Sequence, residues 1–327
     1  LTASSVVGLV EVLKNYSFFK ALFADILRWI REHRPRVVCL VDYPGLNLRL
    51  AAALREQGLS VKGGGKIKVL YYISPQIWAW KAKRRFTMAR DLDAMAVIFP
   101  FEPACYHDTS LPVKFVGHPF VVADYAAPVH YDPRGPVLLL PGSRKQAVAR
   151  IFPVLLAGFQ AFAQESTDAT AVVLYPSDTI LGVLQAAQPP KNVRLLKVSG
   201  DHASSAGERG PQAAAAVLTS SGTMSMHCAL AGIPGAIAYR ANPLTYVLGR
   251  MLLQVEYLGI ANLLLQEPMY PEFIQGAASP AALAEQVRDC IRNPARQAQT
   301  AADTARLRSL LSVPASGTAA DWLVRQA

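Results

Sequence analysis

Short apolar runs that alternate with helix-like segments are the feature that most constrains this chain. Residues 36–41 (RVVCLV) form one such run, and the turn-forming sequence DYPG follows at 42–45. A short apolar run that a turn closes is typical of a buried strand in a parallel sheet. Residues 46–57 then have helical character as far as Gly58, where a helix is expected to end. This order of strand, turn and helix predicts an α/β fold with parallel sheets.

The predicted strands form two series on either side of a Pro-rich stretch at 119–136. The first series continues after residues 36–41 with runs at 66–73, 93–99 and 113–116. The second series has runs at 137–140, 171–175, 193–197, 214–218 and 235–239. We therefore expect two doubly wound domains, over residues 1–125 and 126–327, with the last helix packing back on the first. Ligands of such sheets bind at the carboxyl ends of the strands.

The composition restricts the partners without choosing among them. The chain has 327 residues, a hydrophobic fraction of 52% and a net charge of +10. A basic excess favours an anionic partner such as nucleic acid, acidic lipid or a phosphorylated substrate. The four cysteines are far apart and form no CxxC pair, which indicates reduced thiols. The sequence contains no uninterrupted run of about 18 apolar residues, so no membrane span is predicted. The histidines form no metal-binding motif.

Two turns in the second series have the composition of phosphate-binding sites. PGSR at 141–144 and SSGT at 220–223 each stand between a predicted strand and a predicted helix. Free N–H groups at a helix start favour a phosphate, and an arginine can add a bidentate contact. Taken alone, PGSR is equally consistent with phosphate binding and with an ordinary connection of a strand to a helix. For SSGT alone, helix capping is the commoner use of Ser and Thr. Two such turns in one domain favour a diphosphate between them, although neither is a P-loop or a GxGxxG motif.

Two acidic motifs of the first series have different interpretations. Asp42 follows a predicted strand, where a carboxylate can act as a general base. An Asx-turn with Pro44 and Gly45 explains the same residue without any catalysis. The Asp91-Leu92-Asp93 sequence resembles a metal-binding DxD motif but precedes a strand. We interpret it as a helix end and a strand start.

The segment YYISPQIWAWKAKRR at 71–85 combines aromatic and basic residues. Residues 62–90 contain eight Lys or Arg and no acid. This stretch is either a solvated basic face or a patch for anionic lipid, with tryptophans as interfacial anchors. The apolar stretch LTYVLGRMLL at 244–253 is more typical of core packing than of membrane contact. No nucleic-acid-binding module is present, which argues against nucleic acid as the partner.

The ordered set of motifs resembles the lipid-A-disaccharide synthase family. Its segments are YYISPQIWAWKAKRR (71–85), IFPFE (98–102), FVGHP (115–119), LLLPGSR (138–144), SSGT (220–223), YRANPLTY (239–246) and NLLLQEPMYPEFIQ (262–275). VDYPGLN at 41–47 resembles the family's D-x-P-x-F-N element, with Leu46 in place of Phe. The resemblance runs from about residue 7 to about residue 310. It implies a GT-B glycosyltransferase of family 19, with two Rossmann-like domains facing a cleft.

The resemblance also implies a reaction and its partners. The family transfers 2,3-diacylglucosamine from UDP-2,3-diacylglucosamine to 2,3-diacylglucosamine 1-phosphate (lipid X). The product is the β-1,6-linked lipid A disaccharide 1-phosphate, and UDP leaves with inversion at the sugar. No metal and no other cofactor is expected. The implied location is an anionic membrane surface, at the cytoplasmic face of the inner membrane, with peripheral attachment. A homodimer is an assembly that the resemblance allows.

The roles of individual residues also follow from the resemblance. Asp42 would be the base, and Arg144 would stabilise the departing diphosphate. Residues implied at the UDP-sugar donor are Gly142, Ser143, Arg144, Ser221, Gly222, Thr223, His227, Asn262 and Gln275. Residues implied at the acceptor or the cleft are Asn47, Trp78, Glu102 and His118. The membrane or phosphate patch comprises Trp80, Lys81, Lys83, Arg84 and Arg85.

Two departures from the family pattern leave alternatives open. His227 stands where the family usually has Glu, and an imidazole cannot accept two hydrogen bonds as a carboxylate does. The first βαβ unit of the family has no counterpart in the sequence, so we expect an incomplete N-terminal sheet. One alternative is a non-catalytic membrane-surface remnant of the family. Another is a different GT-B enzyme that uses a UDP-sugar, such as the peptidoglycan GlcNAc transferase or UDP-GlcNAc 2-epimerase, although SPQIWAW and PEFIQ argue against both.

Overall fold

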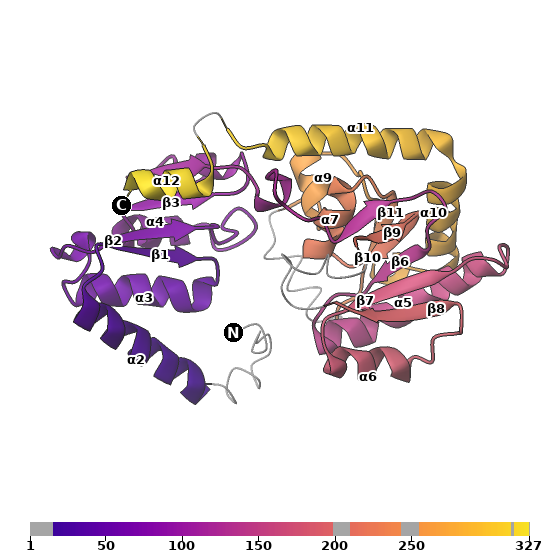
Figure 1. Cartoon of the computed structure of the whole chain (residues 1–327), viewed down its shortest axis with the longest axis horizontal. Coiled ribbons are helices and arrows are strands. Elements are labelled where there is room, and N and C mark those ends of the chain that lie inside the picture. The colour runs from indigo at the N-terminus through magenta and orange to yellow at the C-terminus, as the bar shows by residue number, and fades with distance from the viewer. Residues whose placement is uncertain (1–15, 199–209, 243–254, 315–316, 327) are drawn as a thin grey trace. The chain divides into compact units, whose positions relative to one another are not determined.

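The computed structural model describes residues 16–198, 210–242, 255–314 and 317–326 (Figure 1). Two compact units divide the chain. Unit 1 comprises Leu1–Val122 and Leu311–Ala327, and unit 2 comprises Ala123–Leu310.

Unit 1 contains a four-stranded parallel sheet in the order β1-β2-β3-β4. The strands are β1 (Val37–Val41), β2 (Lys68–Tyr72), β3 (Ala94–Val97) and β4 (Val113–Phe115). The helices are α2 (Tyr16–His33), α3 (Pro44–Glu56), α4 (Arg84–Asp91) and α12 (Ala319–Gln326). Short 3-10 helices occur at Val61–Gly63, Glu102–Tyr106 and Pro119–Val121.

The two faces of the unit 1 sheet are covered by different helices. Side chains alternate between faces along a strand, so Val69 and Tyr71 point to one side of β2 and Leu70 to the other. Val69 and Tyr71 pack in a core with buried residues of α2, α3 and α4. Leu70 packs in a second core with Trp322 of α12. The C-terminal helix therefore covers the face opposite to α2 and α3 (Figure 1).

Unit 2 contains a six-stranded parallel sheet in the order β12-β11-β10-β6-β7-β8. Its strands are β6 (Val137–Leu140), β7 (Ala171–Tyr175), β8 (Val193–Lys197), β10 (Ala216–Thr219), β11 (Gly235–Tyr239) and β12 (Glu272–Ile274). A separate pair joins β5 (Val129–Tyr131) and β9 (Gln212–Ala214). The helices are α5 (Lys145–Ala163), α6 (Asp178–Ala186), α7 (Thr223–Leu230), α9 (Ile260–Leu265), α10 (Pro280–Arg292) and α11 (Pro294–Leu311), with a 3-10 helix at Gln275–Ala277.

Helix α5 forms the centre of the unit 2 core. Phe152, Leu155 and Phe159 are completely buried and pack with residues of β6, β7 and α10. Among the described residues, α5 is the one helix whose length and composition would suffice to cross a membrane. Half of its apolar window is buried inside the protein. This burial is typical of a core helix.

The predicted α/β class with parallel sheets is confirmed, and many strands lie where the sequence placed them. The runs at 137–140, 171–175, 193–197 and 235–239 match β6, β7, β8 and β11. The run at 214–218 is shifted, because its first residue belongs to β9, while β10 ends at Thr219. Residues 91–93 do end α4 and precede β3. The predicted apolar helix at 244–253 lies outside the described residues.

Candidate active site

The two predicted phosphate turns lie side by side in unit 2. They follow β6 and β10, which are hydrogen-bonded neighbours with Leu140 opposite Thr219. The Ser220 N–H donates to the Leu140 carbonyl at 2.9 Å, which continues the pairing into the turns. Gly142 has a φ of +101°, and a Cβ added there would lie 3.2 Å from Ser220 Oγ. A glycine is therefore favoured at 142 both by its backbone conformation and by the close approach of the second turn.

Each turn leads directly into a helix, so two helix starts face the same edge of the sheet. Arg144 caps α5 without a side-chain hydrogen bond to it, and Gly222 occupies the same position for α7. Ser143, Arg144, Gly222 and Thr223 are exposed, and Ser221 is half-buried. Within the described part of the chain, no acid forms an ion pair with Arg144. Exposed N–H groups and an arginine not paired with an acid suit a phosphate.

Strands β11 and then β12 follow β10 in the sheet, and side chains hold the loop after β11 in place. Gln275 follows β12, and its side-chain amide accepts from the Ala241 N–H at 2.9 Å and donates to the Ala241 carbonyl at 3.2 Å. Arg240 follows β11 and donates to the carbonyls of Gln275 and Ala278. Arg240 was not among the predicted site residues, although it lies in the YRANPLTY motif. Gln275 is predicted at the donor, and in the structure it holds the loop after β11.

Asn262 lies on α9 and is completely buried. Its amide donates to the Tyr270 carbonyl at 2.7 Å and to Glu272 Oε1 at 2.9 Å, and its oxygen accepts from the Tyr270 N–H at 2.9 Å. Glu272 in turn accepts from the N–H groups of Leu258 and Gly259 before α9. Asn262 therefore joins α9 to β12. Its predicted contact with the donor stays a prediction.

His227 lies on α7, one helical turn after Thr223. The imidazole is buried and stacks on the Tyr125 ring, with the ring centroids 5.6 Å apart and the planes 5° apart. The Tyr125 hydroxyl lies 3.3 Å from Nε2 and 3.4 Å from Nδ1 of His227. This histidine therefore packs against the segment that begins unit 2.

In unit 1, Asp42 stands immediately after β1 with its side chain exposed. Its backbone has a φ of +47°, and Tyr43 follows with a φ of +44°. Asn47, another predicted residue, donates from its amide to the carbonyls of Val41 at 2.9 Å and Asp42 at 2.6 Å. Because α3 begins at Pro44, this turn is the connection of a strand to a helix, as the sequence predicted.

The predicted residues Trp78, Glu102 and His118 lie in one aromatic cluster at the same edge of the sheet as Asp42. Trp78 packs edge-on against Phe99 and Phe101, whose centroids lie 6.3 and 5.5 Å from the indole. His118 packs against Phe99 at 5.6 Å. Glu102 is buried and accepts from the N–H groups of Ile98 and Phe99 at 3.2 and 3.0 Å. The carboxylate thus fixes the turn that follows β3.

Burial moves the pKa values of Glu102 and His118 in opposite directions. Desolvation raises the pKa of Glu102 to about 7, although two backbone N–H groups and the Trp78 indole partly oppose it. The Trp78 N–H is near this carboxyl but meets no acceptor at hydrogen-bonding geometry among the described residues. Desolvation lowers the pKa of His118 to about 4. The neutral ring accepts from the Phe120 N–H at 3.1 Å. Both groups are therefore mainly uncharged at slightly acidic pH.

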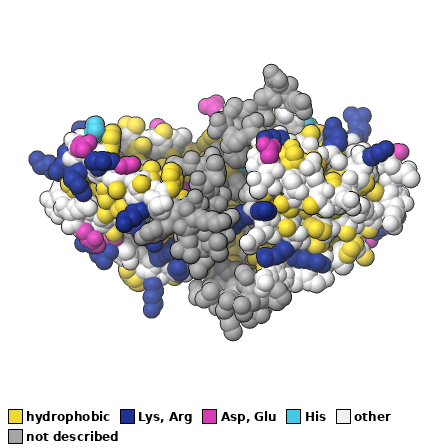
Figure 2. Space-filling view, turned by 90° about the horizontal axis from the view of Figure 1, so that it is seen from below, with side chains coloured by type: hydrophobic (Ala, Val, Ile, Leu, Met, Phe, Trp, Pro, Cys, Tyr) yellow, Lys and Arg dark blue, Asp and Glu magenta, His cyan; other side chains and the backbone are white. Residues whose placement is uncertain are grey.

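The aromatic and basic patch surrounds the start of α4. Trp80 and Phe86 are 44% and 49% exposed, and Lys81 Nζ lies 4.4 Å from the Trp80 ring centroid. Lys83 is exposed, and the Arg84 guanidinium lies 5.4 Å from the Trp80 ring centroid. Arg85 instead forms a bidentate pair with Asp108 at 2.7 and 2.6 Å. On the face shown in Figure 2, Lys and Arg are spread among apolar side chains rather than gathered in one continuous patch.

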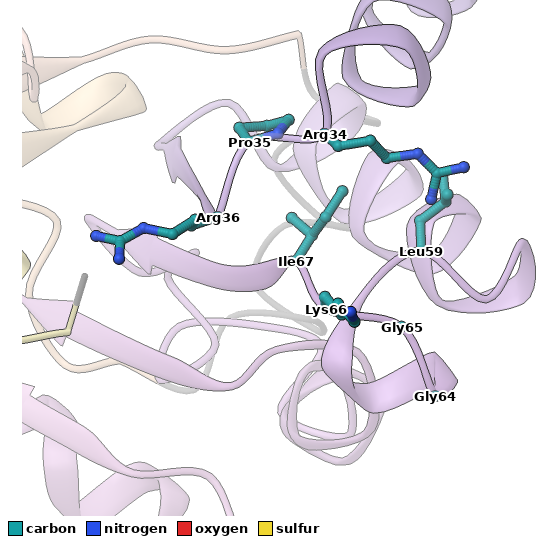
Figure 3. Close-up of a pocket in the computed structure, with 8 residues that line it drawn as sticks. All are labelled: Arg34, Pro35, Arg36, Leu59, Gly64, Gly65, Lys66 and Ile67. Carbon is teal, nitrogen blue, oxygen red and sulfur yellow. The ribbon is translucent and has the colours of Figure 1, made fainter.

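A hollow of about 560 Å³ lies at the opposite edge of the unit 1 sheet, at the amino ends of β1 and β2. Arg34, Arg36, Lys66 and Ile67 are among its lining residues. Figure 3 shows the side chains of Arg34 and Arg36 pointing away from each other. Its arginines therefore do not converge on one anion. Within the described ranges, no group of three or more His, Cys, Asp or Glu could hold a metal ion.

The comparisons with known proteins agree on a family. The family model described as lipid-A-disaccharide synthetase matches residues 1–323. The lipid-A-disaccharide synthase of Geobacter sulfurreducens is 35% identical over 321 residues, which cover 94% of this chain and 79% of that protein. Lipid-A-disaccharide synthase 1 of Legionella pneumophila strain Lens is 34% identical over 322 residues, with coverage of 95% and 80%.

Solved structures with low sequence identity show the same fold. UDP-GlcNAc 2-epimerase from Neisseria meningitidis has a TM-score of 0.58 at 11% identity, covering 98% of this chain and 81% of that one. A spinosyn rhamnosyltransferase has a TM-score of 0.52 at 13% identity, with coverage of 95% and 77%. The neighbours indicate the GT-B fold. Together with the family match, they show that the chain belongs to the lipid-A-disaccharide synthetase family, whose members are glycosyltransferases of lipid A disaccharide synthesis.

Proposed function

We propose that this enzyme transfers 2,3-diacylglucosamine from its UDP carrier to 2,3-diacylglucosamine 1-phosphate, forming the β-1,6-linked disaccharide and UDP. The family supplies the reaction class, with a UDP-sugar donor and a lipid acceptor. The observation that carries the proposal is the pair of adjacent turns in unit 2. Two helix starts, Gly142 and an arginine without an acid partner meet at one edge of the sheet, as a diphosphate requires.

In the proposed mechanism, Asp42 removes the proton from the acceptor 6-hydroxyl. The oxygen then attacks the anomeric carbon as the bond to the UDP oxygen breaks, in one displacement that inverts the configuration. The electron pair of the broken bond goes to the diphosphate. Arg144 and the N–H groups at the starts of α5 and α7 stabilise that charge. The carboxylate of Asp42 is exposed, as a base that must meet a second substrate has to be.

Exchange of Asp42 for Asn tests the base. The Asp42→Asn side chain keeps its size but cannot take a proton, so we expect kcat to fall by about 10²- to 10⁴-fold. Disaccharide formation is measured with purified donor and acceptor. Asp25→Asn, an exposed carboxylate of unit 1 paired with Arg28, is the control and should keep its activity. Near-normal turnover of Asp42→Asn would remove the base assignment.

Exchange of Arg144 for Ala tests the diphosphate site. We expect UDP affinity to fall and kcat to fall by about 10²-fold, because the leaving group loses a cationic partner. Calorimetric titration with UDP gives the affinity. Arg150 is an exposed arginine further along α5, so Arg150→Ala is a matched control for net charge. A wild-type UDP affinity in Arg144→Ala would argue against this site, and no UDP binding by wild type would favour the non-catalytic alternative.

We further propose peripheral attachment to an anionic membrane surface at the cytoplasmic face of the inner membrane. The support is the exposed Trp80, with Lys81 and Arg84 near its ring, because an indole at the interface and nearby cations favour acidic lipid. Vesicles of phosphatidylcholine with and without phosphatidylglycerol provide the test by sedimentation. Trp80→Ser should reduce binding to the anionic vesicles, whereas Val324→Ser, which removes a more exposed apolar side chain on α12, should not. Equal binding of all three proteins would exclude the patch.

A further inference from the structure

The two residues that follow β1 both have a left-handed backbone conformation. Asp42 has a φ of +47°, and Tyr43 has φ and ψ of +44° and +63°. Neither is glycine, and residues with a side chain rarely adopt this conformation. Such a turn persists only where its surroundings determine it. The contacts that hold the turn therefore bear on where the Asp42 carboxylate is placed.

Two side chains converge on the main-chain carbonyl of Asp42. The Tyr71 hydroxyl donates to this oxygen at 2.6 Å, and the Asn47 amide donates to it at 2.6 Å. The Asp42 N–H is held as well, because it donates to the Tyr72 carbonyl at 2.9 Å. By contrast, no hydrogen bond or ion pair of the described residues involves the Asp42 carboxylate. The backbone on both sides of the Asp42 side chain is thus fixed, while the acid remains exposed.

The surroundings of Tyr71 keep its hydroxyl protonated, so that it acts as a hydrogen-bond donor. It is completely buried on β2, on the face that packs against α2, α3 and α4. The sheet register places Leu40 opposite Tyr71, two residues before Asp42. Burial raises the pKa of the Tyr71 hydroxyl, and the nearby Asp42 charge raises it further. The hydroxyl is therefore protonated at neutral pH, and its oxygen-bound hydrogen is directed at the Asp42 carbonyl.

We propose that Tyr71 and Asn47 are positioning residues, which hold the main chain of Asp42 so that its carboxylate meets the acceptor hydroxyl. The proposal rests on the proposed role of Asp42 as base. Neither side chain needs to touch a substrate. Without the two hydrogen bonds the left-handed turn can relax, and the carboxylate then moves with the peptide. A displacement of about 1 Å in a reacting group can lower the rate by about 10²-fold.

The test compares Tyr71→Phe with Tyr72→Phe. The two tyrosines are adjacent on β2, but Tyr72 packs on the opposite face, with Leu70 and Trp322. We expect Tyr71→Phe to lower kcat by about 10- to 100-fold with little change in either KM, since only the placement of the base is affected. Tyr72→Phe should keep the wild-type kcat. Asn47→Ala is the second variant, and it should also lower kcat at constant KM even if Tyr71→Phe fails to fold.

Asp42→Asn, assayed alongside, separates the two proposals. If Asp42→Asn is inactive while Tyr71→Phe and Asn47→Ala match Tyr72→Phe in kcat, the positioning role is overturned and the base assignment stands. If the variants raise a KM without lowering kcat, they act on substrate binding, and the positioning role is again overturned. If Asp42→Asn turns over normally, the base assignment and the positioning role both fall.

Discussion

At the scale of single residues, two buried groups of unit 1 have opposite effects on how the stability of the fold changes with pH. Folding raises the pKa of Glu102 from 4.5 to about 7, so the folded protein binds more protons than the unfolded one between these pH values. The contribution of Glu102 to stability therefore falls as pH rises through this range. Folding lowers the pKa of His118 from 6.5 to about 4, so its contribution rises with pH over that range. Where the two pH ranges overlap, these opposite changes in stability largely cancel.

Removing either group should reveal the slope of the other. Relative to wild type, Glu102→Gln should gain about 3 kcal/mol of unfolding free energy between pH 4.5 and 7, because the buried charge is no longer formed. Relative to wild type, the unfolding free energy of His118→Gln should instead fall as pH rises from 4 to 6.5. Denaturant unfolding at several pH values measures both differences. Stability curves that run parallel to wild type would show that neither group titrates with these shifted pKa values.

Asn262 gives a second prediction at this scale. Because its buried amide makes three hydrogen bonds to Tyr270 and Glu272, Asn262→Ala should lower the unfolding free energy by about 2–4 kcal/mol. If Asn262 only joins α9 to β12, UDP affinity of the folded variant stays within a few-fold of wild type. Gln160→Ala, which removes an exposed amide on α5, should change neither quantity. A stable Asn262→Ala variant with much weaker UDP binding would instead make Asn262 a donor contact.

The sequence placed Asp42 at a strand end, because the apolar run before it and the turn after it are both local patterns. It did not reveal Tyr71 as the donor to Asp42. The two residues are 29 positions apart, and their hydrogen bond depends on the register of β1 against β2. Nothing in the aromatic pair Tyr71-Tyr72 distinguishes the buried donor from its neighbour. Side-chain partners across a sheet therefore require the structure.

At the scale of elements, the sequence predicted strands that are buried on both faces. All four residues of β6 and all five of β7 are buried, and the contiguous apolar runs predicted both strands with the observed bounds. The three-residue strands β5 and β12 were not predicted, because they include polar residues and are only partly buried. Their extended form is set by a neighbouring strand, β9 or β11, rather than by their own pattern.

Two helical glycines should respond in opposite ways to alanine. Gly158 of α5 is buried, and a Cβ there would lie 2.5 Å from Leu283 Cβ of α10. Gly182 of α6 is exposed and has nothing within 4 Å of an added Cβ. Gly182→Ala should stabilise by about 0.5–1 kcal/mol through helix propensity. Gly158→Ala should destabilise by about 1–3 kcal/mol, because α5 and α10 must move apart. Thermal unfolding of both variants tests the contact between α5 and α10. Stabilisation by both substitutions would show that α10 can move away from α5 at little cost.

At the scale of the whole molecule, the chain ends in the unit where it begins. Unit 2 is one continuous segment, whereas unit 1 needs the last residues to complete its second core. Trp322 of α12 packs there with Leu70 of β2 and with Ala94 and Ala96 of β3. Lys68 Nζ also donates to the Gln326 carbonyl at 2.9 Å. The stability of unit 1 therefore depends on residues made after unit 2 is complete.

Trp322→Ala should accordingly weaken unit 1 alone. Truncating a buried tryptophan costs about 3–5 kcal/mol, and the cavity would lie against β2 and β3. Unit 2 has a separate core around α5, so its strands should be unaffected. Amide hydrogen exchange measures each unit in the same molecule: exchange should accelerate in β2 and β3 but not in β6 and β7. Val324→Ala, whose side chain is 76% exposed on the same helix, should leave both unchanged. Equal acceleration in β2 and β6 would mean that the units unfold as one cooperative body, because a local defect would then lower the stability of both.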